Sequence, residues 1–270
     1  MLILKQAGER TGARVVVLGT FDGVHLGHQE LIRRGRIVSQ SAGIPLRVCT
    51  FDRHPLAVIR PGKQPPLLTT LAEKAERMDA CGVDELRVLS FDQRMADTPP
   101  GDFLRLLREE QEIRAIVAGW NYTFGSKGAG TADRLLEDGR CFGYEVIIVP
   151  PVVTERGEII SSSAIREKLA QGNVTGAAEM LGAPYSLRGT LHAERLQGPG
   201  ERGNRFLFQP DSGKALPGPG RYEGRVQLCG NTFSARITAG REPRFMVEPL
   251  TGEARQSEGT ARLTLLRGIA

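Results

Sequence analysis

Short apolar runs alternate with amphipathic segments between residues 15 and 185. Continuous apolar runs of about 4–8 residues are typical of strands buried on both faces, and such strands separated by helices form parallel sheets. The pattern therefore predicts an α/β unit in which helices cover a parallel sheet. The expected strands are residues 15–19, 46–51, 85–90, 115–118 and 145–149.

Two helix starts carry local signals. Thr70 followed by Glu73 forms a capping box, and Thr98 stands before two prolines, which are favoured in the first turn of a helix. Another helix is expected directly after the first strand of the sheet. Its inward-facing apolar residues are expected to be Leu31, Ile32 and Ile37.

The pattern changes from about Ser186 to short segments separated by glycine and proline, such as residues 198–200 and 217–220. Residues 225–228 and 232–237 alternate apolar and polar side chains, as strands with one buried face do. We expect a domain boundary near residues 183–188. The prediction is an α/β domain over residues 1–185 and a small antiparallel β domain over residues 186–270.

The composition excludes several classes of protein. A net charge of +5 and a pI near 9.2 suit anionic ligands, but they also describe a modestly basic soluble protein. No Lys/Arg run of the kind that binds nucleic acid occurs, so no nucleic-acid partner is expected. The four cysteines are scattered, without a C-x-x-C pair or an adjacent histidine. We expect reduced thiols in a cytoplasmic protein, with neither zinc nor disulfides.

The first four residues are apolar, but Lys5, Glu9 and Arg10 follow at once. This stretch is far shorter than the core of a signal peptide or a membrane span, so no membrane association is expected. We predict a short strand here.

The first strand of the sheet runs into the motif Gly-Thr-Phe-Asp-Gly-Val-His-Leu-Gly-His, residues 19–28, and a helix is expected to follow. A glycine-rich turn and a helix N-terminus at the carboxyl edge of a parallel sheet are a typical place for phosphate binding. His25 and His28 can both face one anion there and donate N–H bonds to phosphoryl oxygens. A metal pair is less favoured, because no carboxylate-rich ligand set accompanies them. The other candidate ligand-binding residues of the motif are Gly19, Phe21 and Gly27.

His54 follows the second strand, in Thr-Phe-Asp-Arg-His-Pro, residues 50–55. The carboxyl ends of parallel strands meet at one edge of a sheet, so this histidine is expected at the same edge as His25 and His28. The alternative is a loop histidine held beside Pro55.

The fourth strand is followed by a loop of aromatics, glycines and one lysine, residues 119–130. Such a loop can stack a ring system while its backbone approaches a phosphate. Asn121 and Phe124 are the candidate ligand-binding residues. The alternative is that these aromatics pack only against their own surroundings.

Three serines and Arg166 lie in Ser-Ser-Ser-Ala-Ile-Arg, residues 161–166, after the fifth strand. Serines cap helices routinely, so the hydroxyls alone indicate little. A cation in the first turn opposes the helix dipole, which is tolerable where an anion binds. Ser162, Ser163 and Arg166 are therefore candidate polyphosphate ligands, with plain helix capping as the alternative.

Taken in order, these motifs and residues 181–185 resemble the bacterial bifunctional riboflavin kinase/FAD synthetase family over residues 14–185. The resemblance implies a Rossmann-like nucleotidylyltransferase domain with a parallel sheet, followed by a small antiparallel β-barrel. It implies an FMN adenylyltransferase that uses ATP and FMN, assisted by Mg²⁺. His25 and His28 would contact the ATP phosphates, Ser162, Ser163 and Arg166 the β- and γ-phosphates, and Asn121 the flavin or phosphate side.

The C-terminal part departs from the family. At the place of the Pro-Thr-Ala-Asn segment of the riboflavin kinase stand residues 204–207, Asn-Arg-Phe-Leu. Glu248 corresponds to the segment of the family's catalytic glutamate, but Pro249 follows it. The resemblance therefore implies a degenerate barrel and no kinase activity. Its role (stability, dimerisation or flavin capture) and the oligomeric state stay open.

Phosphate motifs do not name the acceptor. Two alternatives to FAD synthesis therefore stay open. One is a nucleotidylyltransferase with another phosphorylated acceptor, and the other is a non-catalytic flavin or nucleotide sensor.

Overall fold

The computed structural model describes residues 1–5, 11–194, 205–250 and 258–269. The chain divides into two compact units, each described by itself below. The first unit comprises Met1–Pro65 and Thr69–Ile159, and the second Pro66–Leu68 and Ile160–Ala270. The boundary that we placed near residue 185 stays a prediction.

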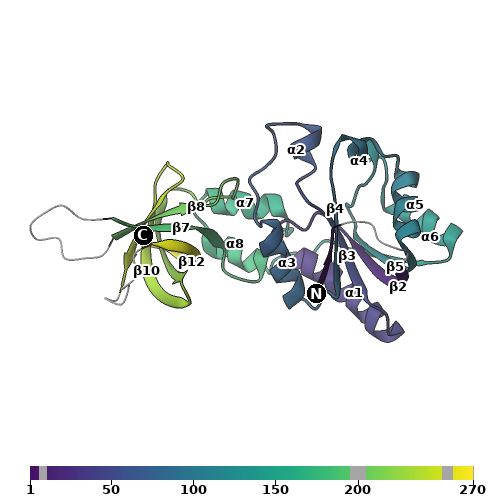
Figure 1. Ribbon diagram of the computed structural model, residues 1–270, viewed down its shortest axis with the longest axis horizontal. Coiled ribbons are helices and arrows are strands. Elements are labelled where there is room, and N and C mark those ends of the chain that lie inside the picture. The colour runs from purple at the N-terminus through teal and green to yellow at the C-terminus, as the bar shows by residue number, and fades with distance from the viewer. Residues whose placement is uncertain (6–10, 195–204, 251–257, 270) are drawn as a thin grey trace, which may run out of the picture. The chain divides into compact units, whose positions relative to one another are not determined.

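The first unit is built on a six-stranded sheet in the order β1-β4-β3-β2-β5-β6, and every neighbouring pair is parallel (Figure 1). The predicted parallel sheet is confirmed. Two strands have the predicted bounds, 46–51 and 145–149, whereas the strand predicted to begin at residue 115 begins at Gln111. The strands are β1 (Leu2–Leu4), β2 (Thr11–Leu18), β3 (Leu46–Phe51), β4 (Glu85–Leu89), β5 (Gln111–Gly119) and β6 (Glu145–Val149).

Helices cover both faces of this sheet, as Figure 1 shows. On one face α1 and α3 pack over Val15 and Val17 of β2, and on the other α5 and α6 pack over Val16 and Leu18 of the same strand. A segment buried on both faces needs apolar residues at every position, which explains the uninterrupted apolar run 15–18 in the second half of β2. The helical elements are α1 (Leu26–Ala42), α2 (Leu56–Ile59), α3 (Leu71–Ala80), α4 (Gln93–Asp97), α5 (Pro100–Glu110), the 3-10 turn η1 (Ser126–Gly128) and α6 (Ala132–Phe142).

Both predicted helix starts exist. Thr70 and Glu73 form the complete capping box of α3, with Thr70 Oγ1 accepting from Glu73 N and Glu73 Oε2 accepting from Thr70 N. Helix α5 begins at Pro100 with Pro99 as its N-cap, while Thr98 ends α4.

The expected inward face of α1 is partly wrong. Leu31 and Ile32 are buried, but Ile37 is 51% exposed. Gly35 and Ser39 complete the buried side. With 3.6 residues per turn, Ile37 lies about 140° around the helix from Ile32, on the solvent side.

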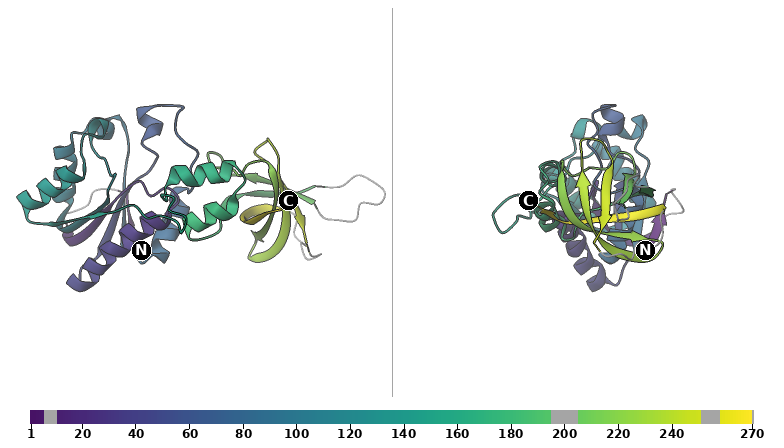
Figure 2. Two further views of the ribbon diagram at one scale, coloured as in Figure 1. Left: turned by 180° about the vertical axis from the view of Figure 1, so that it is seen from behind. Right: turned by 90° about the vertical axis from the view of Figure 1, so that its left-hand side faces the viewer.

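The second unit contains α7 (Ser162–Ala170), α8 (Val174–Leu181) and a closed barrel in the order β10-β11-β8-β7-β12-β9 (Figure 2). Every neighbouring pair in the barrel is antiparallel. The predicted antiparallel β-barrel is thus confirmed. The barrel strands are β7 (Ser186–Glu194), β8 (Arg205–Pro210), β9 (Gly220–Leu228), β10 (Asn231–Ala239), β11 (Phe245–Pro249) and β12 (Gly259–Ile269).

Alternate residues of β9 and β10 are buried, as the predicted runs 225–228 and 232–237 require. The glycine- and proline-containing turn predicted at residues 198–200 lies outside the described residues.

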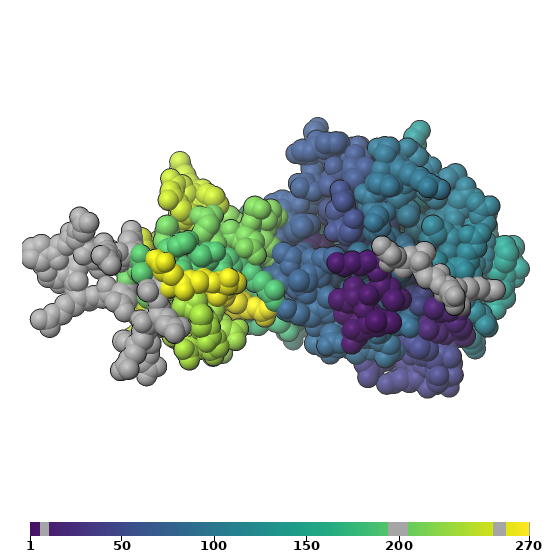
Figure 3. Space-filling view, viewed as in Figure 1, coloured from purple at the N-terminus to yellow at the C-terminus, as the bar shows by residue number. Residues whose placement is uncertain are grey.

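The short strand predicted at the N-terminus is β1, which pairs with β4 at the edge of the sheet and lies open on the face shown in Figure 3 (dark purple). No helix within the described ranges is both long and apolar enough to cross a membrane. All four cysteines are described, and none forms a disulfide.

Candidate active site

The turn between β2 and α1 lies at the centre of the sheet. Strand β2 has β3 on one side and β5 on the other, so the chain order reverses here. Ligands of open parallel sheets bind at the carboxyl ends of the strands at such a switch point. The candidate phosphate-binding motif therefore stands at the switch point of the sheet, where the 17-residue helix α1 begins.

His25 is the N-cap of α1. Its Nδ1 accepts a hydrogen bond from the backbone N of His28, with 3.4 Å between the two atoms. An accepting Nδ1 carries no proton, so the neutral ring of His25 carries its proton on Nε2. The rings of His25 and His28 are stacked, with centroids 3.7 Å apart and an interplanar angle of 20°. The structure thus brings the two predicted histidines together as one pair.

Burial, followed by the nearby His25 and Lys74, holds the pKa of His28 well below its usual range. His28 is therefore a neutral imidazole at physiological pH. The Nδ1 atom of His28 is buried and has no hydrogen-bond partner among the described residues. A neutral imidazole can donate from only one nitrogen, so its capacity is that of a single hydrogen-bond donor.

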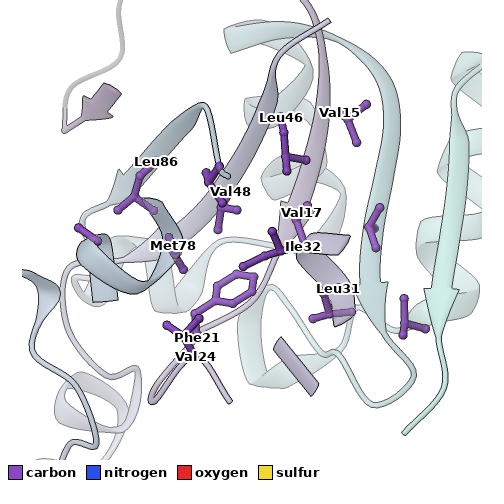
Figure 4. Close-up of a cluster of buried hydrophobic side chains, with 14 of the residues drawn as sticks. Val15, Val17, Phe21, Val24, Leu31, Ile32, Leu46, Val48, Met78 and Leu86 are labelled. Atoms are coloured by element: carbon purple, nitrogen blue, oxygen red, sulfur yellow. The ribbon is translucent and has the colours of Figure 1, made fainter. Parts of the chain in front are cut away.

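The turn leading to His25 is strained. Phe21 has φ +54° and Val24 has φ +44°, values that non-glycine and especially β-branched residues rarely adopt, while Gly23 has φ +87°. The side chains of Phe21 and Val24 are fully buried in the core beside Ile32 and Met78 (Figure 4). Burial of these two side chains offsets the backbone strain.

Gly19, Phe21 and Gly27 are placed around the same turn. A Cβ at Gly19 would come 2.9 Å from Phe21 Cε2, so the glycine makes room for that ring. The Phe21 ring also contacts His28, with centroids 5.0 Å apart. Since Phe21 is 0% exposed, its ring supports His28 and presents no face to a ligand. Gly27 is the second residue of α1.

Three side chains that the sequence analysis missed contact the turn. Thr69 lies just before α3, and Lys74 and Arg77 lie on it. Thr69 Oγ1 accepts from Gly23 N at 2.9 Å, and Lys74 Nζ donates to Thr20 O at 2.7 Å. Arg77 Nη1 donates to Gly23 O at 3.4 Å. A sequence signal for Lys74 exists, because it lies one helical turn before the buried Met78 and therefore on the inward face of α3.

His54 lies half-buried at the carboxyl end of β3, and its Nδ1 accepts from Leu56 N at 3.2 Å. This bond fixes the ring at the start of the one-turn helix α2. The arrangement is the one expected if His54 is a loop histidine held beside Pro55. It also leaves the proton of the neutral ring on Nε2.

The loop after β5 separates into a packed part and an exposed part. Phe124 is 5% exposed and packs against Phe103 and Tyr122, so its ring belongs to the core and is not a stacking platform. Trp120 is 49% exposed, and Asn121 is exposed beside it. Trp120 is therefore the aromatic of this loop that can meet a ring system.

In the second unit, Ser161 caps α7 by accepting from Ala164 N at 3.2 Å, and Ser162 and Ser163 are the first two helical residues. Arg166 was expected in the first turn of α7. It is the fifth helical residue and lies just beyond that turn. Its Nε donates to the Pro66 carbonyl at 2.7 Å.

The predicted site residues thus fall in two groups. The first unit holds the histidine pair with Gly19, Phe21 and Gly27 around one turn, and His54 and Asn121 follow other strands of the same sheet edge. The second unit holds Ser162, Ser163 and Arg166 on α7. No group of three or more His, Cys, Asp or Glu side chains that could hold a metal ion occurs in the part of the chain that the structure describes.

Comparison with known proteins gives consistent results. A model of the FAD synthetase family matches residues 8–164. A bifunctional riboflavin kinase/FMN adenylyltransferase of Listeria monocytogenes is 37% identical over 186 residues, which cover 67% of this chain and 58% of that protein. The enzyme of the same description from Bacillus subtilis is 30% identical over 244 residues, which cover 88% of this chain and 75% of the relative. This chain therefore spans 58% and 75% of the lengths of these two relatives.

Among solved structures, a crystal structure described as a macrolide-efflux protein from Streptococcus pneumoniae is similar with a TM-score of 0.85 and 31% identity. The similarity covers 99% of this chain and 90% of that one.

Proposed function

Because the chain belongs to the FAD synthetase family, we propose that it transfers AMP from ATP to FMN, forming FAD and pyrophosphate. The observation that carries the proposal is the stacked pair of His25 and His28 at the N-terminus of α1, on the switch point of the sheet. Two imidazoles beside the N-terminus of a helix suit an anion of high charge.

In this reaction an oxygen of the FMN phosphate forms a bond to the α-phosphorus of ATP, and the bond from that phosphorus to the bridging oxygen of pyrophosphate breaks. The FMN phosphate is already an anion, so no catalytic base is needed. The protein aligns the groups and stabilises the charge of the transition state. In the first unit, His25 and His28 would donate to the ATP phosphates. The contacts of Ser162, Ser163 and Arg166 with the β- and γ-phosphates stay as the family resemblance implies them.

Mg²⁺ is the metal that we expect with ATP. The imidazole and hydroxyl groups of the candidate site are not the oxygen-rich set that Mg²⁺ prefers in a protein cage. The metal would therefore be held mainly by the phosphate oxygens of the substrate, where it neutralises their charge.

The flavin is expected beside His54, Trp120 and Asn121. The exposed indole of Trp120 supplies an aromatic face, and Asn121 supplies an amide that can both donate and accept. These groups follow β3 and β5, which lie on the two sides of β2. This placement favours a flavin over an acceptor without a ring system.

We further propose that the barrel has no riboflavin kinase activity. The resemblance places Glu248 in the segment that holds the family's catalytic glutamate. Glu248 accepts from Arg205 Nε at 2.8 Å, and Arg236 Nη1 lies 4.0 Å from its other oxygen. The carboxylate that would act as a base is thus engaged with two arginine side chains. Leu207, at the place of a magnesium-binding residue, is unable to coordinate a metal. Asn204 of the same segment lies outside the described residues.

The test is to incubate the pure protein with ATP and Mg²⁺ and either FMN or riboflavin, and to separate the products by chromatography. We expect FAD from FMN and no product from riboflavin. FMN formed from riboflavin at a rate comparable to FAD synthesis would contradict the loss of the kinase. AMP transfer to another phosphorylated acceptor but not to FMN would favour the second enzyme class, and ligand binding without turnover would favour a sensor.

A further inference from the structure

The strained turn before His25 is held by side chains from a segment far away in the sequence. Thr20 O, at the start of the turn, accepts from Lys74 Nζ at 2.7 Å and from Thr50 Oγ1 at 3.0 Å. Lys74 Nζ also donates to Thr50 Oγ1 at 3.2 Å. These three contacts join the carboxyl ends of β2 and β3 to α3.

The middle of the turn is held by the same segment. Asp22 Oδ1 accepts from Thr69 N at 3.0 Å, and Gly23 N donates to Thr69 Oγ1 at 2.9 Å. Arg77 Nη1 donates to Gly23 O at 3.4 Å. Hydrogen bonds to both the N–H and the C=O of Gly23 fix the peptide planes on either side of a residue with positive φ.

We propose that Thr69, Lys74 and Arg77, which we call the α3 brace, hold this turn in its phosphate-binding conformation, and that Lys74 is the principal positioning residue. The proposal rests on the proposed function of the turn as the ATP phosphate site. None of the three residues needs to touch the substrate. They act through the position of His25 and His28.

The location of Lys74 supports this role. Lysine is almost never buried without a partner, yet Lys74 is only 8% exposed. The other buried residues of α3 are Glu73, Ala75 and Met78. An apolar residue at this position would satisfy the core. The ammonium instead ends at the carbonyl of Thr20 and lies near the carboxylate of Asp22.

Lys74 also acts on His28 through its charge. The titratable and charged groups of this region are Asp22 and His25 on the turn, His28 on α1, and Lys74 and Arg77 on α3. A cation beside His28 disfavours protonation of the imidazole. Burial is the main cause of the lowered pKa of His28, and the charge of Lys74 adds to it. The brace therefore sets the position of the second histidine and contributes to its neutral state.

The capping box of α3 gives the brace its register. Thr70 and Glu73 fix the first turn of the helix, so that Thr69 directly precedes the N-cap and Lys74 is the fourth helical residue. Buried donors and acceptors held in this way cost no reorganisation when the phosphate arrives.

The experiment compares Lys74→Met, Lys74→Arg and Thr69→Val with the matched control Lys63→Met, which removes an exposed lysine of the same unit. Pyrophosphate binding is measured by calorimetry, the titration of His28 by NMR, and FAD formation by chromatography. For Lys74→Met we expect at least a tenfold loss of pyrophosphate affinity, an upward shift of the pKa of His28 and a lower kcat. We expect Lys74→Arg to recover part of the affinity, and Lys63→Met to behave as wild type.

The proposal would be overturned if Lys74→Met and Thr69→Val both bind pyrophosphate as tightly as wild type and both leave the titration of His28 unchanged. Thr69→Val keeps the shape of the side chain and decides the question if Lys74→Met does not fold. The two proposals fail separately. If the wild-type chain forms no FAD but the variants still lose pyrophosphate affinity and shift His28, the reaction is wrong and the brace stands.

Discussion

Replacing Lys74 by Met should change how the stability of the first unit depends on pH. Burial lowers the pKa of Lys74 from 10.5 to about 8, and the nearby Asp22 only partly opposes this effect. The pKa in the folded state thus lies below that in the unfolded state. Between about pH 8 and pH 10.5 the unfolded chain binds more protons, so the free energy of unfolding rises with pH across this window.

The expected size follows from the same pKa values. A fall from 10.5 to about 8 corresponds to about 3 kcal/mol. Below pH 8 wild type bears this full cost of a buried charge, whereas Lys74→Met does not. We therefore expect Lys74→Met to be no less stable than wild type near neutral pH, although its activity is reduced. The advantage of the variant should shrink by about 3 kcal/mol as the pH rises to 10.5.

The assay is chemical denaturation of both proteins at several pH values between about 7 and 10.5, followed by tryptophan fluorescence. Trp120 is the one tryptophan of the chain and lies in the first unit, as Lys74 does. Taking the difference between the two proteins cancels the titration of other groups, and Lys63→Met gives the effect of removing an exposed lysine. A difference that stays constant from pH 8 to 10.5 would refute the reasoning.

Three further predictions concern single side chains. His28→Ala should lower the turnover of FAD synthesis by about 10- to 1,000-fold, the cost of losing one transition-state donor, and a wild-type rate would make the motif structural. Arg166→Ala should raise the KM for ATP by about 10- to 100-fold through the loss of a charge-assisted bond, and an unchanged KM would oppose its contact with the phosphates. Thr70→Ala should lower the free energy of unfolding by about 1 kcal/mol through loss of the N-cap of α3, measured by denaturation. The control for Thr70→Ala is Thr131→Ala, because Thr131 makes no side-chain capping bond at α6. An equal fall in the free energy of unfolding in both variants would contradict the capping argument.

Much of the first unit could be predicted from the sequence. The strands 46–51 and 145–149 and the capping box of Thr70 and Glu73 were predicted as the structure has them. These features depend on neighbours within a few residues, where side-chain type and backbone geometry are directly coupled. The pairing of His25 with His28 has the same origin, since residues three apart at a helix start face the same way.

Predictions that depended on the rotational position of a side chain around its helix were less accurate. Ile37 was expected inside α1 and lies outside, and Arg166 was expected in the first turn of α7 and lies just beyond it. An error of one or two residues in a helix start turns a side chain by 100° or 200° around the axis. An apolar residue by itself does not reveal such an error.

The sequence by itself determined the alternation of strands and helices, the helix start of α3 and the histidine pair, because these follow from local patterns. The tertiary structure alone decided that Phe21 is a buried support for His28, that Val24 has a positive φ, and which groups the Lys74 ammonium meets. Lys74 meets Thr20 across 54 positions of the chain, and Thr69 meets Asp22 across 47. No local pattern predicts such contacts. The desolvation cost of a buried lysine is offset only when folding brings a carbonyl and a carboxylate close to its ammonium group.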